Sequence, residues 1–208
     1  MERYESQGQF RKRKRRELHR AEKRFERHKR VNLLASPGKH QSILILDNLK
    51  PDYNIGKIFR SADAFGVKEL HLIGVDYFDP SPAVGSFKWV PAKFQNSFDD
   101  VYFDLDNRGW TLFALEPYGG ELITNGNLPE KSAFILGHEQ FGLSFKISDY
   151  PKIRPLTIPQ FGKVQSLNVS VAASIVLYEY ARQFGSPEVS NTNFEFVADD
   201  RSPDLPKA

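Results

Sequence analysis

A run of four consecutive apolar residues at positions 43–46, Ile-Leu-Ile-Leu, most constrains the fold of this chain. Because the run does not alternate with polar residues, it predicts a strand buried on both faces, as in a parallel sheet. A helix is expected next, capped by Asn54 and ended by Gly66, since the apolar residues between them follow helical spacing. A second strand is expected at residues 70–73. Strand, helix and strand in so short a segment predict a right-handed βαβ unit.

The rest of the chain continues this α/β pattern. Further strands are expected at residues 89–94, 110–115 and 133–136, and a helix at residues 98–105. The last helix, residues 169–184, has a sustained apolar face and is ended by Gly185 and Pro187. These elements predict the α/β class with a parallel sheet.

The chain is expected to have three parts. At 208 residues, of which 40% are hydrophobic, it suits one globular domain with a proper core. We expect that domain at residues 41–185, a basic N-terminal extension at residues 1–40 and a flexible, proline-containing tail at residues 186–208.

The positive charge of the chain is concentrated at its N-terminus. Residues 1–30 hold 13 of the 29 Lys and Arg residues but 5 of the 26 Asp and Glu residues, so this segment carries +8 and the remainder −5. Residues 11–30 interleave acidic and basic residues at helical distances, and Leu18, Ala21 and Phe25 form a narrow apolar stripe. We therefore predict a charged helix that docks nucleic acid, because clustered charges displace counterions from phosphates. A solvated tail and a nuclear-localisation signal have the same composition and are the alternatives.

Composition and missing motifs exclude several classes of protein. The chain has no cysteine, which excludes disulfide scaffolds, thiolate zinc sites, iron–sulfur clusters and cysteine nucleophiles. No apolar run approaches the roughly 18 residues of a membrane span, and the N-terminus is too charged for a signal peptide, so we expect a cytoplasmic protein without membrane contact. The sequence contains no G-x-G-x-x-G dinucleotide-binding motif, no G-K-[ST] phosphate loop and no H-E-x-x-H metal-binding motif. The five histidines are scattered, so no metal site is predicted, and His71 is expected to be a packing residue.

Polar residues follow predicted strands in three segments, and ligands of parallel α/β sheets bind in such places. The first segment is residues 47–62, the second is residues 137–144, and the third consists of residues 158–159 and 164–173. Each has a purely structural explanation as well: Asn54 and Asn168 are good helix caps, the glycines serve turns, and an exposed Arg60 is ordinary.

Taken together and in order, the three segments resemble motifs of the SpoU, or TrmH-like, branch of the SPOUT RNA methyltransferases, over about residues 42–184. The motifs are Asn54-Ile-Gly-x-x-x-Arg60-x-Ala62, Gly137-x-Glu139-x-x-Gly142-Leu-Ser and Ser166-Leu-Asn168-Val-Ser-Val-Ala-Ala. The resemblance implies a parallel sheet with a C-terminal trefoil knot, a homodimer, S-adenosylmethionine as cofactor and methylation of a ribose 2′-hydroxyl in RNA. Periodicity alone predicts no knot, because chains as a rule do not thread loops.

The resemblance also implies roles for individual residues. Arg60 is placed at the target ribose. Its guanidinium is effectively always protonated, so it serves either as a clamp on the neighbouring phosphate that stabilises the developing alkoxide, or as a general base helped by that phosphate. Asn54 and Glu139 are implied to hold Arg60 and the ribose, and Ser166 and Asn168 to bind the sugar-phosphate or anchor the knot. Four positions are implied to contact the cofactor through main-chain groups and apolar surface: Leu115, Gly137, Ile158 and Leu167.

Transfer RNA is the substrate expected from the resemblance, because residues 164–173, with Gln165 before Ser166, look most like the tRNA-modifying enzymes of this branch. The chain departs from the usual pattern at His138 and at Gln140 and Phe141, which bears on substrate preference. The residues expected to dock RNA are Arg13, Lys14, Arg15 and Arg16. The alternatives are ribosomal RNA as substrate, a non-catalytic RNA-binding protein on the same fold, and a different transferase or nucleotide-binding α/β protein.

Overall fold

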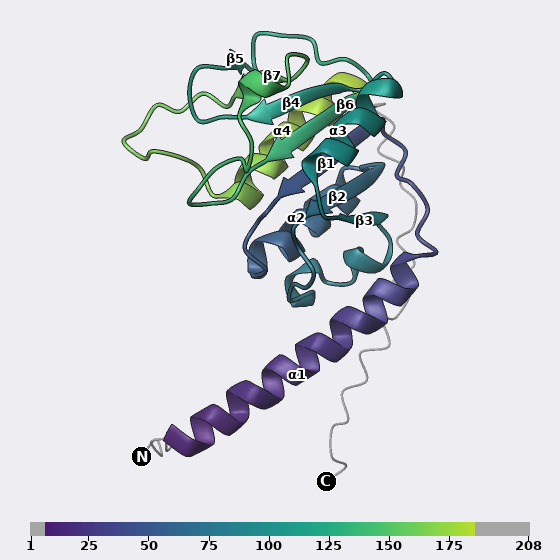
Figure 1. Ribbon diagram of the computed structural model, residues 1–208, viewed down its shortest axis with the longest axis vertical. Coiled ribbons are helices and arrows are strands. Elements are labelled where there is room, and N and C mark those ends of the chain that lie inside the picture. Colours follow the sequence, from purple (N-terminus) through teal and green to yellow (C-terminus); the bar gives the residue numbers. More distant parts are fainter. Residues whose placement is uncertain (1–6, 186–208) are drawn as a thin grey trace.

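The computed structural model describes residues 7–185, which contain a seven-stranded sheet (Figure 1). Neighbouring strands are all parallel, in the order β3-β2-β1-β6-β4-β7-β5. The strands are β1 (Ser42–Asp47), β2 (Glu69–Ile73), β3 (Ala92–Gln95), β4 (Thr111–Leu115), β5 (Glu121–Leu122), β6 (Ser132–Leu136) and β7 (Arg154–Thr157). The predicted α/β class with a parallel sheet is confirmed.

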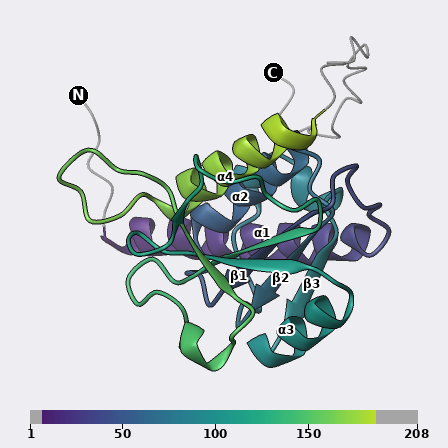
Figure 2. The ribbon, with the colours of Figure 1, turned by 90° about the horizontal axis from the view of Figure 1, so that it is seen from above.

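Helices cover both faces of the sheet (Figure 2). α2 (Tyr53–Ala64) and α4 (Val169–Phe184) pack together over one face, and α3 (Phe98–Asn107) covers the other. Alternate residues of β1 enter the two cores: Leu44 and Leu46 lie under α2 and α4, whereas Ile43 and Ile45 lie under α3. The apolar run at residues 43–46 is thus buried on both faces, as predicted.

The start of α2 differs from the prediction. Asp52, not Asn54, caps the helix, because the Asp52 Oδ1 atom accepts a hydrogen bond of 3.1 Å from the main-chain N–H of Asn54. The prediction for Asn54 is therefore wrong in this respect, and the Asn54 side chain is available for other contacts. The end of α2 agrees with the sequence, since Phe65 closes it and Gly66 follows at a φ of +60°.

Two strands were not predicted, and one was misplaced. β5 has two residues, and β7 (Arg-Pro-Leu-Thr) has an exposed Arg and a Pro, so neither shows an apolar run or a clear alternation. The strand expected at residues 89–94 begins at Ala92 instead, because residues 86–88 form the 3-10 turn η2 (Ser86–Lys88), which Trp89 closes. β7 lies between β4 and β5, strands that are consecutive in the chain. The trefoil knot implied by the resemblance stays a prediction.

The N-terminal helix α1 (Gln7–Asn32) divides into two halves (Figure 1). Its first half extends away from the body, and Leu18 is 53% exposed. Contrary to the prediction, Leu18 is therefore not part of an inward-facing apolar stripe. Ala21 and Phe25 are buried as expected. The Phe25 ring contacts four others, those of Tyr77, Phe78, Phe87 and Phe94. The second half of α1 therefore belongs to the core of the domain.

The Asn32 amide fixes the end of α1 to the segment before β3. Its Nδ2 atom donates to the main-chain oxygens of Phe87, at 2.6 Å, and Val90, at 2.7 Å, while its Oδ1 atom accepts from the Ala92 N–H at 3.0 Å. Both N–H donors and the oxygen of this buried amide are therefore engaged. The direction in which α1 leaves the body is thereby set.

Three further sequence expectations concern the C-terminal tail, membrane contact and His71. Pro187 and the predicted tail, residues 186–208, lie outside the described residues. Within residues 7–185, no helix is both long and apolar enough to cross a membrane. His71 is buried and hydrogen-bonded to Glu69, in agreement with a packing role.

Candidate active site

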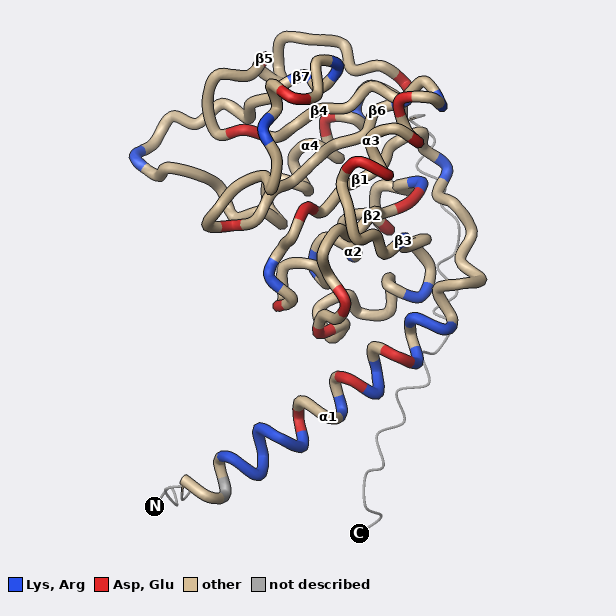
Figure 3. Tube along the Cα trace, in the orientation of Figure 1, with Lys and Arg blue, Asp and Glu red and all other residues tan. Residues whose placement is uncertain are grey.

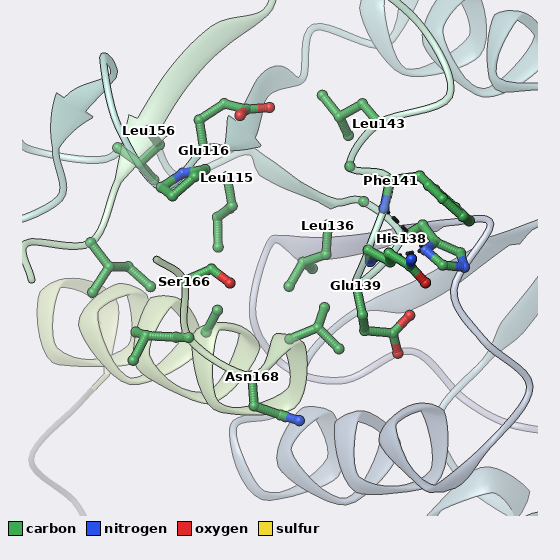
Figure 4. Close-up of a pocket in the computed structure, with 18 of the residues that line it drawn as sticks. Leu115, Glu116, Leu136, His138, Glu139, Phe141, Leu143, Leu156, Ser166 and Asn168 are labelled. Carbon is green, nitrogen blue, oxygen red and sulfur yellow. Dashed lines mark hydrogen bonds between the residues drawn. The ribbon is translucent and has the colours of Figure 1, made fainter. Parts of the chain in front are cut away.

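A cavity of about 540 Å³ lies at the carboxyl ends of β4, β6 and β7 (Figure 4). Neighbouring parallel strands end here, which is where α/β sheets place their ligands. All four residues predicted to contact the cofactor line it: Leu115, Gly137, Ile158 and Leu167. Glu139, Ser166 and Asn168 line it as well. Loops that are far apart in the sequence thus meet around one cavity.

The loop after β6 is held in a tight conformation. His138 and Gly142 exchange two main-chain hydrogen bonds, of 2.8 and 2.9 Å, and Gly142 adopts a φ of +72°. A Cβ atom on Gly137 would lie 2.5 Å from the Gly142 carbonyl carbon, so only glycine fits at position 137. The motif glycines therefore shape this wall of the cavity.

Buried Asp47, the last residue of β1, anchors the far end of the same loop. The Asp47 carboxylate accepts hydrogen bonds from the Ser144 N–H at 2.6 Å and from the Ser144 hydroxyl at 2.8 Å. Sequence analysis placed Asp47 at the start of the first segment without assigning it a role. The contact joins the start of the first segment to the end of the second.

A chain of hydrogen bonds joins all three motifs at the edge of the cavity. The Asn54 Nδ2 atom donates to the Glu139 Oε1 atom at 2.9 Å, and the Asn54 Oδ1 atom accepts from Asn168 Nδ2 at 3.2 Å. The Asn168 Oδ1 atom in turn accepts from the Ser170 N–H at 2.9 Å, which caps α4 as predicted. We call Glu139, Asn54 and Asn168 the polar relay.

The Glu139 carboxylate is an acceptor at neutral pH. Burial by itself would raise the pKa of Glu139, but hydrogen bonds from Asn54 and from the main-chain N–H groups of Glu139 and Lys50 outweigh burial and lower it. A carboxylate that is kept ionised can accept a hydrogen bond from a hydroxyl or an amine but cannot supply a proton.

Arg60 lies apart from the polar relay. It lines a second cavity of about 450 Å³ between α2 and α4, with Lys57, Ser61, Ser174 and Tyr178 among the other lining residues. In the described part of the chain, its guanidinium makes no hydrogen bond or ion pair. Within one chain, Asn54 and Glu139 therefore hold each other and do not contact Arg60. Their implied role in holding Arg60 stays a prediction.

Two residues of the first cavity were missed by sequence analysis. Glu116 follows Leu115 at the end of β4, and burial raises the pKa of its carboxyl group. Gln160 follows β7, and its buried Oε1 atom has no hydrogen-bond partner among the described residues. Both residues follow the carboxyl end of a strand, which is a signal for a ligand contact. For Gln160 this signal could not be used, because β7 was not predicted.

Comparison with known proteins agrees with this geometry. Residues 41–178 match the family model described as the SpoU rRNA methylase family. The chain belongs to this family. A tRNA (guanosine(18)-2′-O)-methyltransferase of Thermus thermophilus is 32% identical over 67% of this chain and 74% of that protein. A 23S rRNA (guanosine-2′-O-)-methyltransferase of Neisseria meningitidis is 30% identical over 68% of this chain and 58% of that protein.

A solved structure with the cofactor bound extends the comparison. The SpoU methyltransferase AviRb of Streptomyces viridochromogenes in complex with AdoMet has 26% sequence identity and a TM-score of 0.61, over 71% of this chain and 61% of that one. As a member of the SpoU family, the chain is an RNA 2′-O-methyltransferase whose cofactor is S-adenosylmethionine. The family thus confirms the class of enzyme that the three motifs indicate.

The cavity of this SpoU methylase fits S-adenosylmethionine. Its volume lies within the range of about 300–1,000 Å³ that is usual for small-molecule sites. Leu115, Leu136 and Leu156 supply an apolar surface for an adenine ring (Figure 4). The half-buried Glu116 carboxyl and the Gln160 Oε1 atom, which has no partner among the described residues, offer acceptors to the N–H groups of the cofactor.

Methyl transfer to a hydroxyl depends on the orientation of the reacting groups and needs little covalent help from a protein. When bound, S-adenosylmethionine supplies an activated methyl group. The polar relay lies at the edge of the cavity, and apolar residues line the cavity beside it. The described residues contain no cluster of three or more His, Asp or Glu side chains that could hold a metal ion.

Proposed function

We propose that this protein methylates a ribose 2′-hydroxyl of transfer RNA. The observation that carries the proposal is the polar relay, which joins the three motifs beside a cavity that fits the cofactor. The Thermus relative, whose name gives tRNA as its substrate, supports this choice of RNA. A cytoplasmic location is part of the same proposal.

Labelled S-adenosylmethionine and total RNA from cells lacking the enzyme test this proposal. We expect label in the tRNA fraction, at a linkage that alkali does not cleave, because a 2′-O-methyl group blocks attack on the neighbouring phosphate. Label in ribosomal RNA would instead favour the substrate of the Neisseria relative. The absence of any transfer by folded protein that binds the cofactor would contradict both.

Arg60 acts, in this proposal, on the substrate of a second copy of the chain. Its own cavity is separate from the cofactor cavity, and its guanidinium points to no partner in the described chain. Val171 and Tyr178, large side chains that are exposed on α4, line the same cavity. A second copy that covers this face through a two-fold axis would bury them and bring Arg60 to a composite site. There the guanidinium would clamp a phosphate and stabilise the developing alkoxide.

Subunit complementation tests this arrangement. Arg60→Ala and Glu139→Ala are each expected to lose activity, but a mixed dimer would pair the intact Arg60 of one copy with the intact Glu139 of the other. Equal mixing with exchange should restore about a quarter of wild-type activity, since half of the dimers are mixed and each has one complete site. No recovery between variants that do exchange would show that Arg60 acts within its own chain. Light scattering should give about twice the chain mass of 23.8 kDa.

The first half of α1 is, in this proposal, an RNA-docking arm. Figure 3 shows its Lys and Arg residues concentrated on a helix that extends from the body. Arg13, Lys14, Arg15 and Arg16 are all exposed. Further along α1, the Arg24 guanidinium donates to the Ser81 hydroxyl, next to Pro82 of the Arg60 cavity. One RNA could therefore contact both the arm and the Arg60 cavity.

A further inference from the structure

We propose that the exposed ring of Phe141 is the surface on which the base of the methylated nucleotide stacks. This inference rests on the proposed function, since it concerns the same substrate. It assigns the enzyme an unpaired, splayed-out nucleotide as target, held through the face of its base. The family match assigns no role to this position, and the sequence shows only that Phe141 departs from the usual motif at a place that bears on substrate preference.

Phe141 combines exposure with a place at the cavity. It is 77% exposed, yet it lines the cavity that holds the cofactor-binding residues. The His138 ring lies against it, with ring centroids 4.7 Å apart and planes inclined by 29° (Figure 4). His138 thus covers one side of the Phe141 ring.

The hydrogen bonds of His138 hold this ring pair in place. The His138 Nδ1 atom accepts from the Gln140 N–H at 3.0 Å and from the Phe141 N–H at 3.3 Å. The main chain of His138 is bonded to Gly142 on the other side of Phe141. Phe141 is therefore presented by a loop with little freedom left to lose, which favours binding because less entropy is lost on association.

The chemistry of the ribose requires the base to be close to this ring. Only C2′ and C1′ separate the 2′-oxygen from the base, so a hydroxyl held beside Glu139 places its own base at the rim of the cavity. Residue 141 is near residue 139 in a closed turn. Unpaired RNA bases are commonly held on aromatic side chains, and such stacking tolerates different bases because each has a π-face.

Other exposed aromatic residues are less suitably placed. Phe161 is 97% exposed and Tyr118 is 66% exposed, but neither lines the cavity. Among the described residues that do line it, Phe141 and His138 are the aromatic ones. These differences provide matched controls: Phe161 on a loop near the cavity, and Phe103, 59% exposed, on α3 across the sheet.

Substitutions at these positions test the inference by steady-state methylation of RNA from cells lacking the enzyme. Phe141→Ala is expected to raise the KM for RNA by about five- to 150-fold, the range for loss of one stacked base. Phe141→Trp, which keeps an aromatic face, is expected to keep the KM near the wild-type value. Phe141→Leu, which keeps apolar volume without a π-face, should behave like Ala. Phe103→Ala should leave the KM for RNA unchanged. Calorimetry should show unchanged affinity for S-adenosylmethionine in every variant.

A spectroscopic measurement needs no methyl transfer. The fluorescence of Phe141→Trp, after subtraction of the wild-type signal, should be quenched by an oligoadenylate more than by an oligouridylate, and not by an abasic oligomer of equal length. Unchanged KM in Phe141→Ala, a loss found only in Phe161→Ala, or a loss of dimer in Phe141→Ala would overturn the inference. Absence of transfer by the wild-type enzyme together with purine-dependent quenching would instead contradict the proposed function alone.

Discussion

Asn54 donates a hydrogen bond of 2.9 Å to Glu139, a residue 85 positions further along the chain. The bond exists because Asp52 takes over the capping of α2 and leaves the Asn54 amide to point toward the loop after β6. Asn54 then accepts from Asn168 with its oxygen. One amide thus fixes the relative positions of a helix start, a turn and the cap of α4, and so determines the shape of the cavity edge.

Asn54→Ala is expected to reduce the turnover number by about tenfold or more, because a hydrogen bond to a charged group contributes about 1.5–3 kcal/mol. Asn54→Asp should be worse, since a second carboxylate beside Glu139 repels it and raises the pKa of the pair. Steady-state rates check this, with cofactor affinity as the control. If Asn54→Asp matches the wild type, the relay has no part in catalysis.

Arg60→Lys is expected to lose most methyl transfer although it keeps the charge. An ammonium cannot reproduce the planar, two-pronged contact of a guanidinium with phosphate. Arg182→Lys is the matched control and should be active, because Arg182 lies exposed on α4 and its ion-pair partner among residues 7–185 is the neighbouring Glu179. Single-turnover rates with saturating RNA measure the step directly. Full activity of Arg60→Lys would show that charge alone suffices.

Much of the fold follows from local sequence signals. β1, β2, β4 and β6 are predictable because strands buried on both faces are rich in apolar residues, and the periodic face of α4 is equally clear. β7 is not predictable in this way. Its sequence has no apolar pattern, and its strand conformation depends on pairing with β4 on one side and with the two residues of β5 on the other.

The site was predictable as a set of residues but not as an arrangement. Motif order indicates that the three segments converge, and they do. Sequence spacing could not show that Asn54 faces Glu139 whereas Arg60, on the same helix, faces a separate cavity, because both depend on how α2 is rotated against the sheet. Glu116 and Gln160 belong to none of the three motifs, and they become candidate cofactor contacts only because the fold partly buries them in the wall of the cavity.

The two halves of α1 should respond differently to substitution. Phe25→Ala is expected to lower the free energy of unfolding by about 3–5 kcal/mol, because it empties the space among four rings in the core. Leu18→Ala, on the same helix but 53% exposed, should change it by less than about 0.5 kcal/mol. Urea unfolding followed by circular dichroism compares the two. Equal effects would mean that α1 is not docked as described.

Glu69 should contribute a stability that depends on pH. Burial alone would raise the pKa of Glu69, but hydrogen bonds and charges from His71 and Lys93 lower it to about 2, from an ordinary value of 4.5. A lowered pKa stabilises the folded state above about pH 4.5, and this stabilisation is lost as the pH falls toward about 2. Glu69→Gln should therefore be less stable than the wild type at pH 7 by about 1.5–3 kcal/mol, a difference that shrinks in acid.

Urea unfolding at several pH values measures this difference. Asp104→Asn, which removes an exposed ion pair with Arg108, is the control and should cost less than about 1 kcal/mol. If Glu69→Gln lowers the free energy of unfolding equally at pH 7 and pH 3, the charge of the Glu69 carboxylate does not stabilise the pairing of β2 with β3.

Neutralising Arg13, Lys14, Arg15 and Arg16 to Gln should weaken RNA binding without changing affinity for S-adenosylmethionine. The four side chains are exposed on the part of α1 that extends from the body, so their loss leaves the core intact. Each lost phosphate contact lowers the slope of log affinity against log salt by roughly 0.7–0.9. Because phosphate contacts position RNA without specifying its sequence, binding to many RNAs should fall by a similar factor.

Filter binding between low and moderate salt gives both slopes. Replacement of Lys131, Lys146, Lys152 and Arg154 by Gln removes the same number of positive charges outside α1, and separates a local docking effect from a change in net charge. We expect the first set to flatten the salt dependence strongly and the second set to do so weakly. Equal slopes for the first set and the wild type would mean that α1 is solvated during binding, and that the surface around Arg60 supplies the phosphate contacts without it.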